Sequence, residues 1–170
     1  LLQSSAASDV YKRQIYDKAG MRASNTAELV FDNCIVPPGN VVGSPGESMI
    51  HMMRNLEIER IALAAMALGI ARRSLYAMNR YASEREAFGS EIRDFGQIQR
   101  HIGESWAEYR AMRSYIYDTA RNTDLSKSGN RLDTDGVKLY STTVAKNIAD
   151  RAIQVMGGYG YVGEYVVERL

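Results

Sequence analysis

Residues 52–70 read MMRNLEIERIALAAMALGI, and this stretch decides the fold. A stripe at positions i, i+4, i+7, i+11, i+14 and i+18 runs through it, a spacing that places side chains on one face of an α-helix. The stripe consists of Met52, Leu56, Glu59, Leu63, Met66 and Ile70. The sequence therefore predicts a long helix over Glu47–Ala82.

Two more periodic segments follow this helix. The predicted second helix, Phe95–Asn122, carries on one face Ile98, Ile102, Ser105, Tyr109, Met112 and Ile116. After a polar linker over Thr123–Arg131, a third helix is predicted for Leu132–Met156, and a fourth begins after Gly163. Long helices joined by short links form up-down bundles. The predicted fold is mainly α, an up-down four-helix bundle with a truncated fourth helix, preceded by the remnant of a β-domain.

The N-terminal part of the chain has a different pattern. Glu28–Phe31 has the composition of a strand, and Cys34–Val36 is a second extended piece before the break at Pro37. Two strands do not form a stable sheet alone, so we expect them to belong to a larger one. The chain is interpreted as a tail or artefactual segment at 1–14, the end of a middle β-domain at 15–45, and an incomplete C-terminal helical-bundle domain at 46–170.

Composition and charge argue against several classes of function. The 170 residues are 45% hydrophobic and 24% charged with a net charge of +1, and no basic stripe indicates a nucleic-acid partner. We see no apolar run of the length that predicts a membrane span. Cys34 is the sole cysteine, which fits a reducing compartment. His51 and His101 are isolated in the sequence, so no metal site is expected.

Glu59 is the first candidate for chemistry, because it is the only charged residue in its stripe. Its neighbours three and four positions away include no cation, whereas Glu57 has Arg54 and Arg60 at a spacing of three. A carboxylate held in a cleft can take up a proton at neutral pH and act as a general base. On the other interpretation, the helix is rotated slightly and Glu59 lies at a solvated edge. The pattern alone leaves both open.

Two glycine-containing segments are candidates for ligand contacts. Arg85–Gly89 follows the first helix, and an Arg beside an aromatic ring can bind a phosphate and a flat ring system. The alternative is an exposed Arg with a Phe that covers the core. Gly157–Gly160 closes the third helix, unlike a dinucleotide fingerprint, which opens one. It is either a helix C-cap or a place where a ligand approaches the backbone, with the amide of Gln154 one turn earlier.

These segments together resemble the acyl-CoA dehydrogenase family over Ala19–Leu170. Arg85–Gly89 resembles the family's Arg-x-x-Phe-Gly motif, and Gln154–Gly160 resembles its Gln-x-x-Gly-Gly-x-Gly motif. Further matching segments are Gly20–Ser24, Val30–Asp32, Val36–Pro37, Glu59–Arg60 and Ala67–Ala71. The order and the spacing of the motifs carry the resemblance. Two positions depart from the family pattern: Gly96 replaces a Gln, and Val166 stands where Pro is common.

The resemblance implies FAD-dependent α,β-dehydrogenation of a short or branched acyl-CoA thioester. In the family a glutamate removes the α-proton, a β-hydride passes to FAD, and an electron-transfer flavoprotein takes the electrons. Leu56–Arg60 resembles the branch that includes the isovaleryl-CoA dehydrogenases, in which this glutamate lies on the first helix of the C-terminal domain. The resemblance thus makes Glu59 the base, and it places Glu57 and Arg60 near the CoA-thioester end of the substrate.

The resemblance also implies contacts to FAD by six residues: Arg85, Phe88, Gln99, Gln154, Gly157 and Gly158. In the family such groups reach an FAD held mainly by the neighbouring subunit, which implies a homo-oligomer, specifically a dimer of dimers. Gly96 takes the place of one polar contact implied for FAD, and the alternative is that Gln97 supplies this contact by a small shift. The family is found in the cytoplasm of bacteria and in the mitochondrial matrix of eukaryotes, so the same location is expected here.

Two other functions stay open at this point. A flavin oxidase or monooxygenase of the same fold would react with oxygen, and a fold alone does not separate it from a dehydrogenase. A non-catalytic helical interaction module would use the bundle as a scaffold. Because most of a β-domain is missing from the 170 residues, we expect this piece alone to be helical, colourless and inactive.

Overall fold

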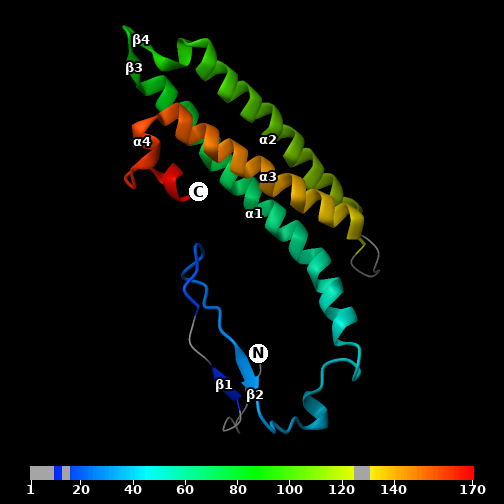
Figure 1. Cartoon of the computed structure of the whole chain (residues 1–170). Coiled ribbons are helices and arrows are strands. Elements are labelled where there is room, and N and C mark those ends of the chain that lie inside the picture. Colours follow the sequence, from blue (N-terminus) through cyan, green and yellow to red (C-terminus); the bar gives the residue numbers. More distant parts are fainter. Residues whose placement is uncertain (1–9, 13–15, 125–130) are drawn as a thin grey trace. The chain divides into compact units, whose positions relative to one another are not determined.

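The computed structural model describes residues 10–12, 16–124 and 131–170. It divides into two compact units, Leu1–Ser48 and Met49–Leu170, which are described separately. The N-terminal unit has a short antiparallel pair of strands, and the C-terminal unit contains three long helices (Figure 1). The predicted mainly helical fold class is confirmed.

Strand β2, Leu29–Phe31, confirms the strand expected at Glu28–Phe31. Its partner is β1, Val10–Lys12, with Tyr11 opposite Val30. β1 lies inside the segment that the sequence analysis interpreted as a tail. The prediction of a second strand at Cys34–Val36 is wrong, because these residues pair with no strand. Cys34–Val36 lie directly before two prolines, and a residue before proline favours extended backbone without any partner strand.

The C-terminal unit is built on helices α1 (Ser48–Glu84), α2 (Gly96–Asn122) and α3 (Arg131–Met156). All three agree with the predicted helices to within two residues at each end. They lie side by side and enclose one apolar core (Figure 1). The stripe predicted for α2 contributes Met112 and Ile116 to that core, and α3 contributes Val137 and Ile148.

Helix α1 packs through a different face from its stripe of large residues. Its buried face is made of small side chains followed by Met78, namely Ala64, Ala67, Ala71, Ser74, Leu75, Met78 and Ala82. The stripe that predicted the helix is largely outside: Leu63 is 43% and Met66 is 55% exposed. Alanines at helical spacing allow α1 to lie close to its neighbours, so packing selected the small-residue face.

Short elements connect and close the helices at one end of the bundle. A hairpin of β3 (Glu86–Ala87) and β4 (Ser90–Glu91) follows α1, and the 3-10 helix η2 (Ile92–Asp94) leads into α2. After α3 come the short helix α4 (Gly158–Tyr161) and the 3-10 helix η3 (Val166–Arg169). The helix expected after Gly163 is therefore a 3-10 turn in this structure.

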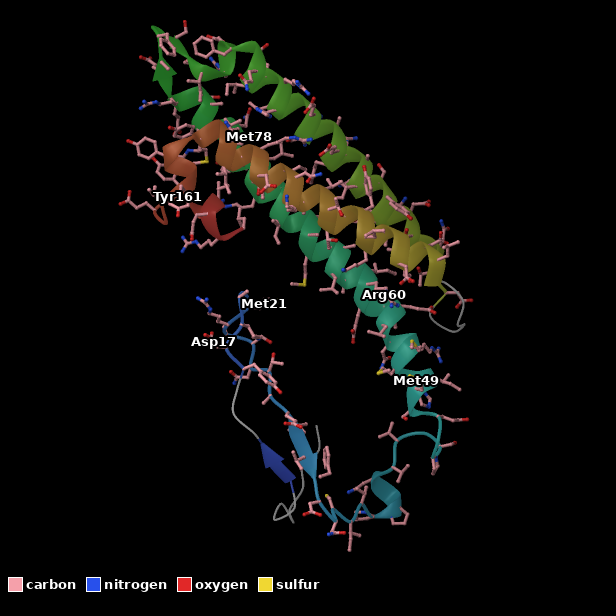
Figure 2. All side chains as sticks on the ribbon, in the orientation of Figure 1. Asp17, Met21, Met49, Arg60, Met78 and Tyr161 are labelled. Carbon is pink, nitrogen blue, oxygen red and sulfur yellow. The ribbon has the colours of Figure 1, made fainter. Side chains whose placement is uncertain are left out.

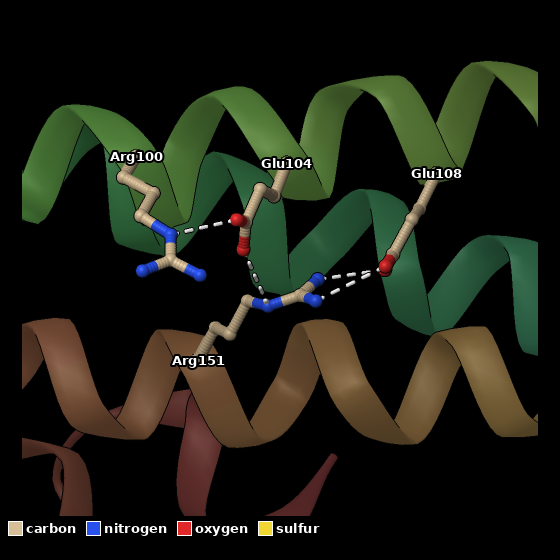
Figure 3. A network of polar contacts seen from close by, with 4 residues as sticks. All are labelled: Arg100, Glu104, Glu108 and Arg151. Carbon is tan, nitrogen blue, oxygen red and sulfur yellow. Dashed lines mark hydrogen bonds and ion pairs between the residues drawn. The ribbon is translucent and has the colours of Figure 1, made fainter.

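A polar network joins α2 to α3 (Figure 3). The guanidinium of Arg151 donates two hydrogen bonds to the carboxylate of Glu108, at 2.6 and 3.0 Å. Its Nε lies 3.8 Å from Glu104, which also accepts a 2.7 Å hydrogen bond from Arg100. These contacts raise the pKa of Arg151 and lower the pKa of Glu104, in both cases mainly through the hydrogen bond. The bidentate pair helps to fix the register of the two helices.

Helix α1 is long and apolar enough, by length and composition, to cross a membrane. Core helices of soluble proteins meet the same criterion, so this observation carries little weight.

Candidate functional site

A pocket of about 440 Å³ lies at the hairpin end of the bundle. It brings Arg85, which directly follows α1, together with Gly157 and Gly158, which follow α3. The remaining lining residues are Tyr81, Ile92, Val155, Met156, Tyr159 and Val162. Arg85 is the sole charged side chain in this lining, so the pocket is an apolar cavity with one cation at its wall.

Arg85 is held by the backbone on both sides. Its N–H donates to the carbonyl of Tyr81 at 2.9 Å, and its own carbonyl accepts from the N–H of Ile92 at 2.8 Å. The ring of Tyr81 contacts Tyr159 and Tyr165, with ring centres 6.2 and 6.1 Å apart. Burial raises the pKa of the Tyr81 phenol, and the nearby Arg85 opposes that shift. Tyr81 is thus a neutral aromatic wall beside the cation.

The glycines opposite Arg85 leave the pocket open. Gly157 has φ +57°, a backbone conformation that side chains rarely adopt, and it is the N-cap of α4. A Cβ added at Gly157 or Gly158 would meet no atom within 4 Å, so a side chain there would enter open space at the pocket wall. Gly160 is small for another reason, since a Cβ there would lie 2.6 Å from the carbonyl oxygen of Ile153. Two of these glycines therefore border the pocket, and the third allows the chain to turn tightly.

Phe88, Gln99 and Gln154 are not among the residues that line this pocket. Phe88 lies in the hairpin turn with φ +53°, is 99% exposed, and touches Phe95 edge-on at 6.3 Å. A large residue in the left-handed region is uncommon and draws attention to the turn. Gln99 and Gln154 are exposed as well. Of the six residues implied to contact FAD, the structure gathers three in one pocket.

Glu59 lies on the exposed face of α1, in the same stripe as Leu63 and Met66. Within the described part of the chain it makes no ion pair. Glu57 faces the other way and is only 8% exposed. Of the two interpretations of Glu59, the described chain shows an exposed carboxylate surrounded by exposed apolar side chains.

Arg60 points toward α3, where its Nε lies 2.6 Å from Oδ1 of Asp135 (Figure 2 labels Arg60). The sequence analysis did not single out Asp135. It lies two positions before the buried Val137 and so outside the apolar stripe of α3, which is why periodicity did not identify it. Tyr81 was missed too, although an aromatic residue one turn before Arg85 was a usable signal.

No group of three or more metal-ligating side chains occurs among the residues that the structure describes. The Arg85 pocket combines a cation, an apolar lining and bare backbone, which are the features of a site for an organic anion.

Comparison with known proteins settles the family. The model of the acyl-CoA dehydrogenase C-terminal domain matches residues 49–170. The chain belongs to the acyl-CoA dehydrogenase family. The resemblance inferred from the motifs is thereby confirmed, and the matched range is the helical unit that carries both Glu59 and the Arg85 pocket.

Two relatives show what the chain is similar to. Isovaleryl-CoA dehydrogenase, mitochondrial, of Oryza sativa subsp. japonica is 41% identical over 157 residues, covering 92% of this chain and 38% of the relative. 2-Methylacyl-CoA dehydrogenase, mitochondrial, of Solanum tuberosum is 39% identical with the same coverage. The chain thus spans about 38% of the length of these relatives.

Solved structures of the family have the same fold. Butyryl-CoA dehydrogenase from Megasphaera elsdenii superposes with a TM-score of 0.89 at 32% identity, covering 97% of this chain and 43% of that one. The prolyl acyl carrier protein oxidase AnaB superposes with a TM-score of 0.88 at 26% identity, covering the same shares. Dehydrogenases and an oxidase therefore share the arrangement of these helices.

Proposed function

We propose that the protein of which this chain is part catalyses FAD-dependent dehydrogenation of a short or branched acyl-CoA thioester, with Glu59 as the catalytic base. One observation carries the proposal. Glu59 is the sole carboxylate in an exposed stripe of large apolar side chains on α1, and it makes no ion pair within the described residues. Its position on the first helix of the family's C-terminal domain, and the isovaleryl-CoA dehydrogenase relatives, support the same assignment.

The two faces of α1 have different roles in this proposal. The small-residue face is used for packing in the bundle, so the opposite face is available to a ligand. Leu56 and Leu63 lie three positions before and four positions after Glu59, on the same side of the helix. An apolar acyl chain lying against these side chains would bring its α-carbon proton within reach of the Glu59 carboxylate, which accepts that proton.

The residues of the Arg85 pocket fit the adenosine diphosphate part of FAD. The Arg85 guanidinium would pair with phosphate oxygens, and the bare backbone at Gly157 and Gly158 leaves space for close approach. Phe88, Gln99 and Gln154 are exposed at this end of the bundle and would complete the contact from outside the pocket. When bound, FAD supplies the hydride acceptor for the β-hydrogen.

The exposure of these groups supports a homo-oligomer, proposed as a dimer of dimers. Phe88 is 99% exposed in a strained turn, a position suited to contact with a cofactor held mainly by a second subunit. We further propose that an electron-transfer flavoprotein accepts the electrons. The proposed location is the mitochondrial matrix if the source is eukaryotic, as the names of the plant relatives indicate for those proteins, and the cytoplasm if it is bacterial.

A flavin oxidase is the second candidate, favoured by the likeness to the oxidase AnaB. The two functions differ in what reoxidises the flavin. Rapid reaction of the substrate-reduced enzyme with molecular oxygen indicates an oxidase, and turnover that needs electron-transfer flavoprotein indicates a dehydrogenase. If the full-length protein neither binds FAD nor bleaches it with acyl-CoA, the helical interaction module is supported instead.

The test of the proposed base is Glu59→Gln in the full-length protein, assayed with an isovaleryl-type thioester. The amide cannot accept a proton, so turnover should fall by roughly 100- to 10,000-fold while the flavin remains bound. Glu84→Gln is the matched control, because Glu84 is an exposed carboxylate at the other end of the same helix, paired with Arg80. Near-normal turnover of Glu59→Gln would overturn the assignment.

A further inference from the structure

We propose that Asp135 on α3 is a positioning residue for Glu59, acting through the neighbouring Arg60. The inference rests on the proposed role of Glu59 as base. Arg60 lies next to Glu59 in the sequence, and its Nε is 2.6 Å from Oδ1 of Asp135. The pair therefore connects α3 to the turn of α1 that carries the reacting carboxylate.

The Arg60–Asp135 contact lies where α1 begins to pack against the bundle. Residues 48–55 of α1 are all exposed, so the first turns of the helix lack packing support within the unit. Glu57 is the first buried residue, and continuous burial of the small-residue face begins only at Ala64. Glu59 thus lies on the boundary between an exposed helical end and a packed helix.

The ion pair fixes the rotation of α1 at that boundary. Successive residues of an α-helix point about 100° apart. With Arg60 held against α3, Glu59 is directed away from Asp135 onto the exposed apolar stripe. Without the pair, the alanine packing beyond Ala64 still anchors the helix, whereas the turns before it are free to fray or rotate.

The partial exposure of the Arg60–Asp135 pair indicates that it contributes little to global stability, although it can still position a catalytic group. The side chains of Arg60 and Asp135 are 23% and 40% exposed, and partly exposed ion pairs contribute little to overall stability. A displacement of about 1 Å at a reacting group can nevertheless cost on the order of 100-fold in rate. Loss of the pair should therefore change catalysis more than it changes unfolding.

The experiment compares Asp135→Asn with Glu108→Gln in the full-length enzyme. Glu108→Gln removes an interhelical carboxylate that joins α2 to α3 through Arg151, and not α3 to α1, so it is the matched control. We expect Asp135→Asn to lower kcat roughly 10- to 100-fold, with flavin content and melting temperature close to those of the control variant. Amide hydrogen exchange over residues 52–60 should accelerate in Asp135→Asn alone.

Rescue tests the direction of the effect. Asp135→Glu keeps the carboxylate and should retain most of kcat. The inference is overturned if Asp135→Asn has normal kcat, or if its kcat falls only in step with flavin loss and melting temperature, as in the control.

Hydrogen exchange separates the failure of this inference from the failure of Glu59 as the proposed base. If Glu59→Gln keeps turnover, the base assignment fails, whatever the exchange shows. If Glu59→Gln is inactive but exchange over residues 52–60 is unchanged in Asp135→Asn, positioning fails alone.

Discussion

The two candidate sites on the helical unit differ in completeness: several elements line the pocket at Arg85, whereas a single helix carries Glu59. The Arg85 end is a pocket of about 440 Å³, formed by residues that lie some seventy positions apart in the sequence. The Glu59 end is a single helical face on which Leu63 and Met66 are 43% and 55% exposed. One end is a formed cavity, and the other is one wall of a site.

The environment of α1 changes along its length and around its circumference. Toward Arg85 it is a core helix, with Met78 and Ala82 fully buried. Toward Glu59 it leaves the bundle and presents apolar side chains. An exposed apolar face of this kind marks a surface for a ligand or another part of a protein.

The strongest test of the contrast uses two methionines on one helix. Met78→Ala should destabilise the 170-residue chain by about 2–5 kcal/mol, because Met78 is fully buried and its removal leaves a cavity. Met66→Ala, on the exposed face, should change the stability by less than about 0.5 kcal/mol. Denaturant unfolding followed by circular dichroism measures both. Equal losses would show that the stripe around Glu59 is packed after all.

The Arg85 end is tested by flavin retention. Arg85→Ala in the full-length protein should remove a charge-assisted contact worth about 1.5–3 kcal/mol, which weakens FAD binding roughly 10- to 100-fold. Flavin content after extensive dialysis, or titration of the apoprotein with FAD, measures this. Arg72→Ala on the exposed side of α1 is the control and should retain its flavin. Full retention in Arg85→Ala would separate the pocket from FAD.

The smallest expected effect is a pH dependence of stability that arises from the Arg100–Glu104 pair on α2. The hydrogen bond from Arg100 holds the pKa of Glu104 below its ordinary value of 4.5. A carboxyl whose pKa is lowered by folding stabilises the fold above the unfolded pKa and loses that contribution as the pH falls through the folded value. The stability difference between wild type and Arg100→Ala should therefore be present at neutral pH and disappear well below pH 4.5. A difference that persists in acid would assign Arg100 another role.

Much of the fold could be predicted because its signals are local. Helical periodicity gave α1, α2 and α3 to within two residues, and a β-rich run gave β2. The prediction of a strand at Cys34–Val36 is wrong, because these residues precede two prolines. A residue before proline favours extended backbone whether or not a partner strand is present. The partner of β2 came from Val10–Lys12, since strand pairing depends on which segments meet and not on local composition.

The candidate sites divide in the same way. Local patterns in the sequence predict the helices, the family and candidate residues for both sites, including a carboxylate within an apolar stripe at Glu59, but not Tyr81 or Asp135. Only the tertiary structure decided which of two apolar faces of α1 packs, that Arg85 meets Gly157 and Gly158, and that Arg60 pairs with Asp135. Sequence periodicity gives the angles between residues on one helix, but it does not give the rotation of that helix within the bundle. Close packing against α2 and α3, which favours small side chains, sets the rotation of the whole helix.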